Sequence, residues 1–134
     1  MIVTMPAFTY KRHIAFHETD AAGVVYFANF FRLAEEAETH ALASLGNIVT
    51  RDGYLYPRVH VEADYLAPLR FFDAVSVHAC ILKIGSSSMD WKFEISSPAG
   101  LCAVVKSTSS RRNLDGSAAP YSEMERAAFT ALMS

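Results

Sequence analysis

The spacing of hydrophobic residues changes once in the first part of the chain. Between residues 8 and 16, apolar side chains alternate loosely with polar ones, which is typical of a strand. Beyond residue 27 the apolar positions lie four, three, four and four residues apart, as on one face of a helix; they are Phe30, Ala34, Ala37, Ala41 and Leu45. Gly46 follows as a natural helix end. The pattern predicts a strand over 8–16 and a largely buried helix over about 27–45.

The second half of the chain is strand-like. Alternation and apolar runs predict four strands, over about 57–67, 74–84, 89–96 and 101–111. Gly85 with the serines at 86–88 separates two of them, and Pro98-Ala99-Gly100 predicts a tight hairpin. A second helical period predicts a C-terminal helical tail over 121–133, folded against the outside. One strand, one helix and then four successive strands is an α+β order.

Composition limits the class of protein. With 134 residues, 51% of them hydrophobic, the chain suits one globular domain with a single core. A formal net charge of −2 gives no footprint for nucleic acid and no basic membrane patch. No apolar run approaches the ~20 residues of a membrane helix, and the N-terminus lacks a signal-peptide pattern. We therefore expect a cytoplasmic protein with no nucleic-acid partner and no integral membrane association.

Cysteine and histidine usage points to neither a disulfide framework nor a metal. Cys80 and Cys102 fall inside apolar strand-like runs, which favours reduced core thiols, while a disulfide between them stays an alternative. The five histidines have no metal-ligand spacing. We expect no metal site.

An acidic, glycine-containing bend over 17–26 joins the first strand to the helix. Its sequence is His-Glu-Thr-Asp-Ala-Ala-Gly-Val-Val-Tyr, with the aspartate at position 20. Asp20 lies just before the point where backbone N–H groups lack a partner within the helix. A carboxylate there can attack a carbonyl or activate water, while the free donors hold the oxyanion. Asp, Ala and Gly are also ordinary turn residues, so spacing alone favours a carboxylate that only caps the turn.

The run from His17 to Asn29, followed by an apolar-periodic helix, resembles the 4-hydroxybenzoyl-CoA thioesterase-like branch of the hotdog-fold acyl-CoA thioesterases. That motif is an aspartate, two small residues, a glycine, two aliphatic residues and then aromatics. The resemblance extends more weakly over nearly the whole chain. It implies a single hotdog domain over 1–134, with a curled antiparallel sheet wrapped around one long central helix. The run from Thr19 to Phe27 is also similar to the 1,4-dihydroxy-2-naphthoyl-CoA thioesterases.

The resemblance further implies hydrolysis of an aromatic or short-to-medium acyl-CoA. Asp20 would be the nucleophile or general base, the backbone amide of Phe27 the oxyanion donor, and Gly23 would shape the bend. Coenzyme A is then part of the substrate, and no cofactor is expected. Two departures stand out. Glu-Glu-Ala-Glu at 35–38 replaces the usual Glu-Arg-Ala-Arg, which puts family-wide ion pairing there in doubt, and Phe72 replaces a usual glycine.

Three residues are candidates for contact with the acyl part of a substrate. His17 could touch the substrate or tune Asp20, although a surface histidine at a strand end is the commoner case. Tyr26 belongs to an aromatic cluster that would suit an aromatic or medium acyl group and would equally fill a core. The resemblance to the naphthoyl-CoA enzymes marks His60, early in its strand, as a pocket residue.

Arginines are the candidates for binding the phosphates of coenzyme A. Arg111 and Arg112 close the last strand, while Arg58 and Arg70 bracket the strand after the helix. Solvated surface charge is the alternative for each.

The open edges of a five-stranded sheet favour pairing with a second copy. We expect a homo-oligomer, either a dimer with a continuous sheet or a tetramer of two such dimers. Two other functions remain as alternatives: a non-catalytic module that binds acyl-CoA or an acyl carrier, and a hotdog dehydratase or hydratase.

Overall fold

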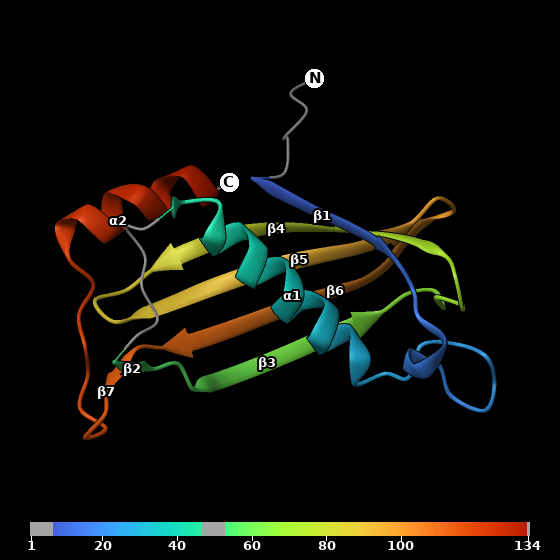
Figure 1. The fold of residues 1–134 in the computed structure, drawn as a ribbon, viewed down its shortest axis with the longest axis horizontal. Helices are drawn as coiled ribbons and strands as arrows, with labels where there is room; N and C mark the ends of the chain where they lie inside the picture. Colours follow the sequence, from blue (N-terminus) through green and yellow to red (C-terminus); the bar gives the residue numbers. More distant parts are fainter. Residues whose placement is uncertain (1–6, 47–52, 134) are drawn as a thin grey trace.

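A computed structural model describes residues 7–46 and 53–133 (Figure 1). The helices and strands are β1 (Phe8–His13), α1 (Asn29–Ala43), β2 (Tyr54–Leu55), β3 (Arg58–Tyr65), β4 (Ala74–Ile84), β5 (Ser88–Ser97), β6 (Gly100–Ser110), β7 (Arg112–Asn113) and α2 (Glu123–Phe129). Short 3-10 turns lie at Phe16–Glu18 and Thr130–Leu132. The order confirms the α+β class. The parts of the predicted segments that fall on residues 1–6, 47–52 and 134 lie outside the described residues.

Five strands form one antiparallel sheet in the order β1-β4-β5-β6-β3. Its register pairs apolar residues across neighbouring strands, such as Val77 with Ile95 and Phe93 with Val105. All four of these side chains are almost fully buried. Pairing of apolar residues on one face fixes the register, because a slip of one residue would turn them to the other face. β2 and β7 form a separate two-stranded sheet.

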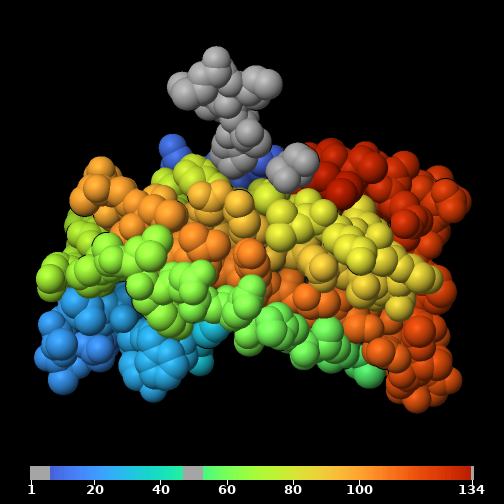
Figure 2. Space-filling model, turned by 180° about the vertical axis from the view of Figure 1, so that it is seen from behind, coloured from blue at the N-terminus to red at the C-terminus, as the bar shows by residue number. Residues whose placement is uncertain are grey.

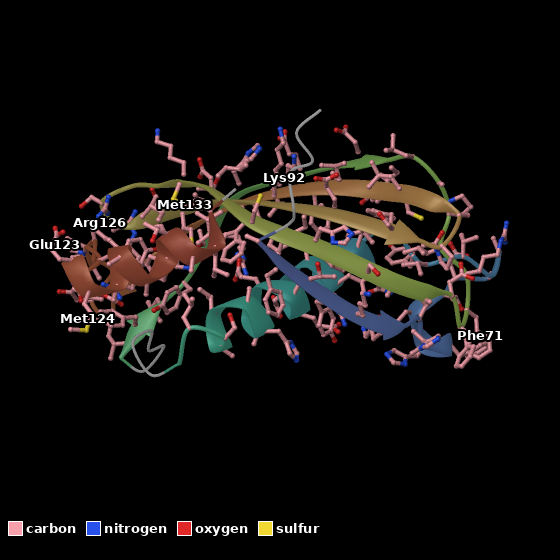
Figure 3. The ribbon with its side chains drawn as sticks, turned by 90° about the horizontal axis from the view of Figure 1, so that it is seen from above. Phe71, Lys92, Glu123, Met124, Arg126 and Met133 are labelled. Carbon is pink, nitrogen blue, oxygen red and sulfur yellow. The ribbon has the colours of Figure 1, made fainter. Side chains whose placement is uncertain are left out.

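Helix α1 lies across the inner face of this sheet (Figure 1). Its buried face includes Phe30, Leu33, Ala34, Ala37 and Ala41, which is the face that the periodicity predicts up to residue 41. Alanines in the middle of this face let the helix approach the sheet closely. The view from above shows β1, in blue, beside α1, with the other strands of the sheet to one side of them (Figure 3).

Two predicted segments are longer than the observed elements. The first strand ends at His13 and not at residue 16, because its partner β4 begins at Ala74, which pairs with His13. The helix has 15 residues instead of the 19 that 27–45 would give, so a long central helix is not confirmed. The chain enters it through a turn at residues 27 and 28. Both differences move the bend and the helix start, which carry the candidate chemistry.

The two cysteines are free and buried, as expected for core thiols. Over the residues that the structure describes, neither helix is long and apolar enough to cross a membrane. Seen from the opposite side, the sheet itself forms the surface, with β3, in green, along one margin (Figure 2).

Candidate active site

The bend between β1 and α1 is held by its own backbone. The amide of Asp20 donates to the carbonyl of Val24 at 2.8 Å, and the amide of Gly23 donates to the carbonyl of Asp20 at 3.0 Å. Gly23 has a φ of +79°, a left-handed conformation that glycine adopts without steric penalty. The Asp20 side chain is exposed, and its Oδ1 accepts the N–H of Ala22 at 2.8 Å. The carboxylate therefore caps the turn and is also accessible, so the two interpretations of Asp20 are compatible.

Two free backbone amides lie between the bend and α1. Within the described residues, the N–H groups of Phe27 and Ala28 have no hydrogen-bond acceptor. The next amides along the chain donate to carbonyls three residues earlier, beginning with Asn29 to Tyr26 at 2.8 Å. Phe27 thus precedes the helix instead of opening it. Its free N–H still lies beside the positive end of the α1 dipole, where negative charge is favoured.

Asp20 and Phe27 line one hollow with a volume of about 460 Å³. Its other walls are apolar or aromatic and come from the bend, the helix start, the end of β3 and the segment after it; they are Val24, Val25, Tyr26, Phe30, Tyr65, Ala67 and Pro68. We call this space the Asp20 hollow. Its lining residues include one with an exposed carboxylate, one whose backbone N–H has no acceptor within the described residues, and several aromatic ones. A carboxylate, a hydrogen-bond donor and apolar walls together suit chemistry on a bound carbonyl group.

Tyr65 is a wall residue that sequence reasoning missed. Its hydroxyl, at the end of β3, donates to the carbonyl of Phe27 at 2.9 Å, and its ring meets that of Phe30 edge-on at 5.2 Å. Burial raises the pKa of this hydroxyl, so it remains a donor at neutral pH. Because Tyr65 lies 38 residues away in sequence, only the apolar alternation of its strand was visible, and nothing in it marked a contact with the bend.

The other predicted substrate residues are divided between the Asp20 hollow and the remaining surface. Tyr26 is in the wall of the hollow. His17 is exposed and is not among the lining residues. His60 is also outside the hollow, with a side chain that is 63% exposed and lies 3.6 Å from the carboxylate of Glu62.

Arg112 is the first residue of β7 and Arg111 directly precedes it. β7 lies at the end of the molecule opposite the bend (Figure 1). Arg111 is 2% exposed and forms a bidentate ion pair with Glu125 at 2.6 and 3.1 Å. Its Nε and Nη2 also donate to the carbonyls of Ala119 and Pro120. Arg112 donates to the hydroxyl of Ser110 at 3.0 Å. Neither arginine is brought to the Asp20 hollow.

The other two candidate arginines differ from each other in whether their guanidinium groups are already paired. Arg58 forms a bidentate ion pair with the buried Glu38 of α1, both distances being 2.6 Å. Arg70 is exposed, and its backbone forms a bridge with Val24 in the wall of the hollow. Within the described residues its guanidinium has no hydrogen-bond or ion-pair partner. Arg70 is therefore the candidate that is both near the hollow and unpaired.

A family model described as the thioesterase-like superfamily matches residues 14–129 of the chain. The chain belongs to this superfamily. Within the superfamily it is 34% identical over 93 residues to a 1,4-dihydroxy-2-naphthoyl-CoA hydrolase of Nostoc punctiforme, a match covering 66% of this chain and 63% of that protein. It is 34% identical over 96 residues to the protein of the same name from Synechocystis, covering 69% and 70%. The match with the Nostoc relative thus spans less than two thirds of its length.

Solved structures agree with this placement. The thioesterase-like chain superposes on a 1,4-dihydroxy-2-naphthoyl-CoA thioesterase from Synechocystis with a TM-score of 0.81 at 30% identity, over 92% of this chain and 95% of that one. It superposes on a gentisyl-coenzyme A thioesterase with a TM-score of 0.81 at 25% identity, over 90% and 98%. The predicted family and its hotdog architecture of antiparallel sheet and helices are confirmed.

Proposed function

We propose that this protein is an acyl-CoA thioesterase that hydrolyses an aromatic acyl-CoA in the Asp20 hollow. The observation that carries the proposal is that Asp20, with its exposed carboxylate, and Phe27, whose N–H has no acceptor within the described residues, line the same aromatic-walled space. Membership of the thioesterase-like superfamily supports it.

In the proposed reaction the thioester carbonyl lies between the two groups. The Phe27 N–H, next to the positive end of α1, binds the carbonyl oxygen and stabilises the negative charge that develops there. The Asp20 carboxylate either attacks the carbonyl carbon, giving an anhydride that water then hydrolyses, or removes a proton from an attacking water. Either route releases the CoA thiol and a carboxylic acid. Neither route requires a separate cofactor, because coenzyme A is part of the substrate.

The walls of the Asp20 hollow favour a planar aromatic acyl group. Phe27, Phe30, Tyr26 and Tyr65 offer ring faces and edges, and aromatic pairs gain beyond the area that they bury. Similarity to naphthoyl-CoA and gentisyl-CoA thioesterases supports the same class of substrate. We further propose that the CoA phosphates use Arg70 in preference to Arg111 or Arg112.

We propose a cytoplasmic location for this enzyme. Free, buried Cys80 and Cys102 suit the reducing conditions of the cytoplasm.

Two alternative functions make different predictions. A binding module without turnover predicts that acyl-CoA binds and is not cleaved. A dehydratase or hydratase would pair a histidine with its acid; among the residues that the structure describes, no histidine lines the Asp20 hollow.

The deciding experiment replaces Asp20 with asparagine and measures thiol release from a panel of aromatic and aliphatic acyl-CoAs. Asparagine keeps the size and the turn hydrogen bond but removes the charge. We expect kcat to fall at least ~10²-fold, with thermal stability and acyl-CoA affinity nearly unchanged. Turnover by Asp20→Asn at the wild-type rate would refute the assignment of the site.

Asp115 provides a matched control. It is also an exposed aspartate, and its Oδ1 accepts the N–H of the residue two positions later, Ser117, at 2.9 Å. Asp115→Asn therefore removes the same kind of charge from the same kind of turn. We expect it to leave kcat unchanged, because Asp115 lies outside the Asp20 hollow.

A further inference from the structure

Glu18 connects β1 to the bend through its side chain. Its carboxylate receives two hydrogen bonds from the guanidinium of Arg12, from Nη1 to Oε1 at 2.7 Å and from Nη2 to Oε2 at 2.5 Å. Oε1 also accepts the amide of Ala15 at 2.8 Å. Glu18 is 6% exposed, so this bidentate pair is largely removed from solvent. Away from water such a charged pair is stronger, and its two parallel hydrogen bonds make its geometry specific.

The backbone of Glu18 reaches the other side of the bend. Its carbonyl accepts the amide of Tyr26 at 3.0 Å and the side-chain amide of Asn29, the first residue of α1, at 2.9 Å. Asp20 lies two positions after Glu18, and Phe27 directly follows Tyr26. One residue therefore ties β1 to both groups of the proposed reaction.

The direction of the Phe27 N–H depends on these bonds. That N–H shares a peptide group with the carbonyl of Tyr26, which accepts the amide of Asn29 at 2.8 Å. The preceding peptide group is held through its N–H by Glu18. With both peptide planes fixed, and with Asn29 itself bonded to Glu18, the free N–H is oriented by contacts that converge on one residue.

We propose that Arg12 and Glu18 are positioning residues, which hold the Asp20 carboxylate and the Phe27 amide at a fixed separation across the Asp20 hollow. The inference rests on the proposed function for its catalytic consequence. Neither residue lines the hollow, so both act through the groups that they hold. Misplacing a reacting group by about 1 Å can cost ~10²-fold in rate, so loss of the Arg12–Glu18 ion pair should have a measurable effect on kcat.

Both members of the Arg12–Glu18 ion pair are charged at neutral pH. Hydrogen bonds from Arg12 lower the pKa of the Glu18 carboxyl against the opposing effect of burial, and the bonds to Glu18 raise the pKa of Arg12. A carboxyl with a lowered pKa keeps its charge until the pH falls through that lowered value. The Arg12–Glu18 pair therefore keeps both charges at neutral pH.

A second ion pair of Arg12 supplies a matched control. Nε of Arg12 donates to Glu36 Oε1 at 2.8 Å, and the hydroxyl of Tyr10 donates to the same oxygen at 2.8 Å. Glu36 lies on α1, and within the described residues its carboxylate makes no hydrogen bond to the bend. If the network only stabilises the fold, loss of Glu36 and loss of Glu18 should have similar consequences. If Glu18 positions the site, only its loss should change turnover.

The test compares Glu18→Gln, Arg12→Gln, Arg12→Lys and Glu36→Gln in the full chain, well below their unfolding temperatures. Thiol release from the best acyl-CoA gives kcat and KM, and amide hydrogen exchange reports on Asp20 and Tyr26. We expect kcat to fall ~10-fold or more in Glu18→Gln and Arg12→Gln, with KM changed much less. Arg12→Lys should recover part of kcat, because lysine keeps the charge and loses the bidentate geometry. Glu36→Gln should keep wild-type kcat.

Hydrogen exchange separates failure of the positioning role from failure of the proposed function. The amides of Asp20 and Tyr26 should exchange faster in Glu18→Gln and at wild-type rates in Glu36→Gln. Equal kcat in Glu18→Gln and wild type, or equal exchange in Glu18→Gln and Glu36→Gln, would overturn the positioning role. An inactive wild-type protein would refute the thioesterase proposal, and the exchange comparison would then still decide whether Glu18 orders the bend.

Discussion

The two backbone polar groups of Phe27 have different surroundings. Within the described residues its N–H has no acceptor, while its carbonyl accepts the Tyr65 hydroxyl and the amide of Phe30. Tyr65 comes from the edge strand β3, far away in sequence. A single hydroxyl therefore couples the strand to the turn that carries the proposed oxyanion donor.

Tyr65→Phe removes only this hydroxyl and should reduce kcat about fivefold, since one hydrogen bond typically contributes about 1 kcal/mol. The Phe27 carbonyl keeps its bond from Phe30, so thermal stability should change little. Steady-state kinetics and thermal unfolding on one preparation measure both quantities. Tyr10→Phe is the control, because the Tyr10 hydroxyl makes a comparable bond to Glu36. A Tyr65→Phe enzyme with wild-type kcat would show that the hydroxyl has no influence on the site.

Single residues also show how far sequence reasoning reached. Asp20, Gly23, Tyr26 and Phe27 are adjacent along the chain, so a local motif could identify them together, and the structure brings three of them into one hollow. Tyr65 could not be found in this way, because its contact with Phe27 exists only after β3 has paired with β6 and placed the strand end beside the bend. Function requires both kinds of contact, local and distant.

The structure does not bring Arg111 and Arg112 to the Asp20 hollow, and the reason is related. Arg111 is a residue type that binds phosphate, but its side chain is paired with Glu125. Glu125 is 14 residues later, in a segment whose packing the sequence did not reveal. A charge is available for a ligand only when no protein group already neutralises it. Sequence lists the charges, and the tertiary fold decides which of them are paired.

At the level of elements, long alternating strands were predicted well and short elements were not. The bounds of β4 match the predicted 74–84, because eleven residues give a clear period. β2 and β7 have two residues each, too few for any period. The first strand ends early although Ile14 and Phe16 continue its alternation, because its ladder with β4 stops at the pair His13–Ala74 and Ile14 bonds instead to the turn at Phe72 and Asp73. Pattern indicates which residues can form a strand, and the partner determines where it ends.

Helix α2 is fastened to the end of β6 by the Arg111–Glu125 ion pair. Glu125 also accepts the amide of Ser122 at 2.9 Å, while its own amide donates to the Ser122 hydroxyl at 3.1 Å. This reciprocal capping box starts the helix. The guanidinium lies 4.3 and 4.7 Å from the centres of the Tyr54 and Tyr121 rings. The short helix is therefore held by its first turn.

Glu125→Gln should destabilise the protein by ~3–5 kcal/mol, since removing one charge leaves the buried guanidinium of Arg111 uncompensated. Burial raises the pKa of Glu125, but the bonds from Arg111 outweigh it and the net pKa is lowered. A lowered folded-state pKa adds stability above the ordinary value near ~4.3 that is lost as the pH falls through the folded-state value. Thermal unfolding between pH 3 and 7 should show a shallower acid slope in the variant. An unchanged melting temperature would contradict this role.

At the scale of the whole molecule, one edge of the sheet is open. β3 is a terminal strand, and seven of its eight residues are exposed. Val59 and Val61 are 59% and 46% exposed. A long edge strand with exposed apolar side chains is a template for pairing with another strand. It borders the Asp20 hollow, because Tyr65 lies at its end.

We expect two copies to pair through β3 into a continuous sheet, with a tetramer of two such dimers as the larger assembly. Light scattering at micromolar concentration should give at least the mass of a dimer. Val61→Lys should shift it toward the monomer, while Leu114→Lys, at an even more exposed leucine near the opposite end, should not. A wild-type monomer at these concentrations would exclude pairing through β3.

The two ends of the sheet carry different features: the proposed active site lies at one end and α2 at the other. The bend, the aromatic rings of Phe16 and Phe71, and the Asp20 hollow lie at one end, while α2 with Glu123 and Arg126 lies at the other (Figure 3). Distant sites generally contribute to stability independently. Substitutions at the α2 end can therefore change the stability of the protein without altering the Asp20 hollow. Stabilising changes there would offset losses caused by reshaping the hollow, so that the acyl specificity of this scaffold can evolve without loss of the fold.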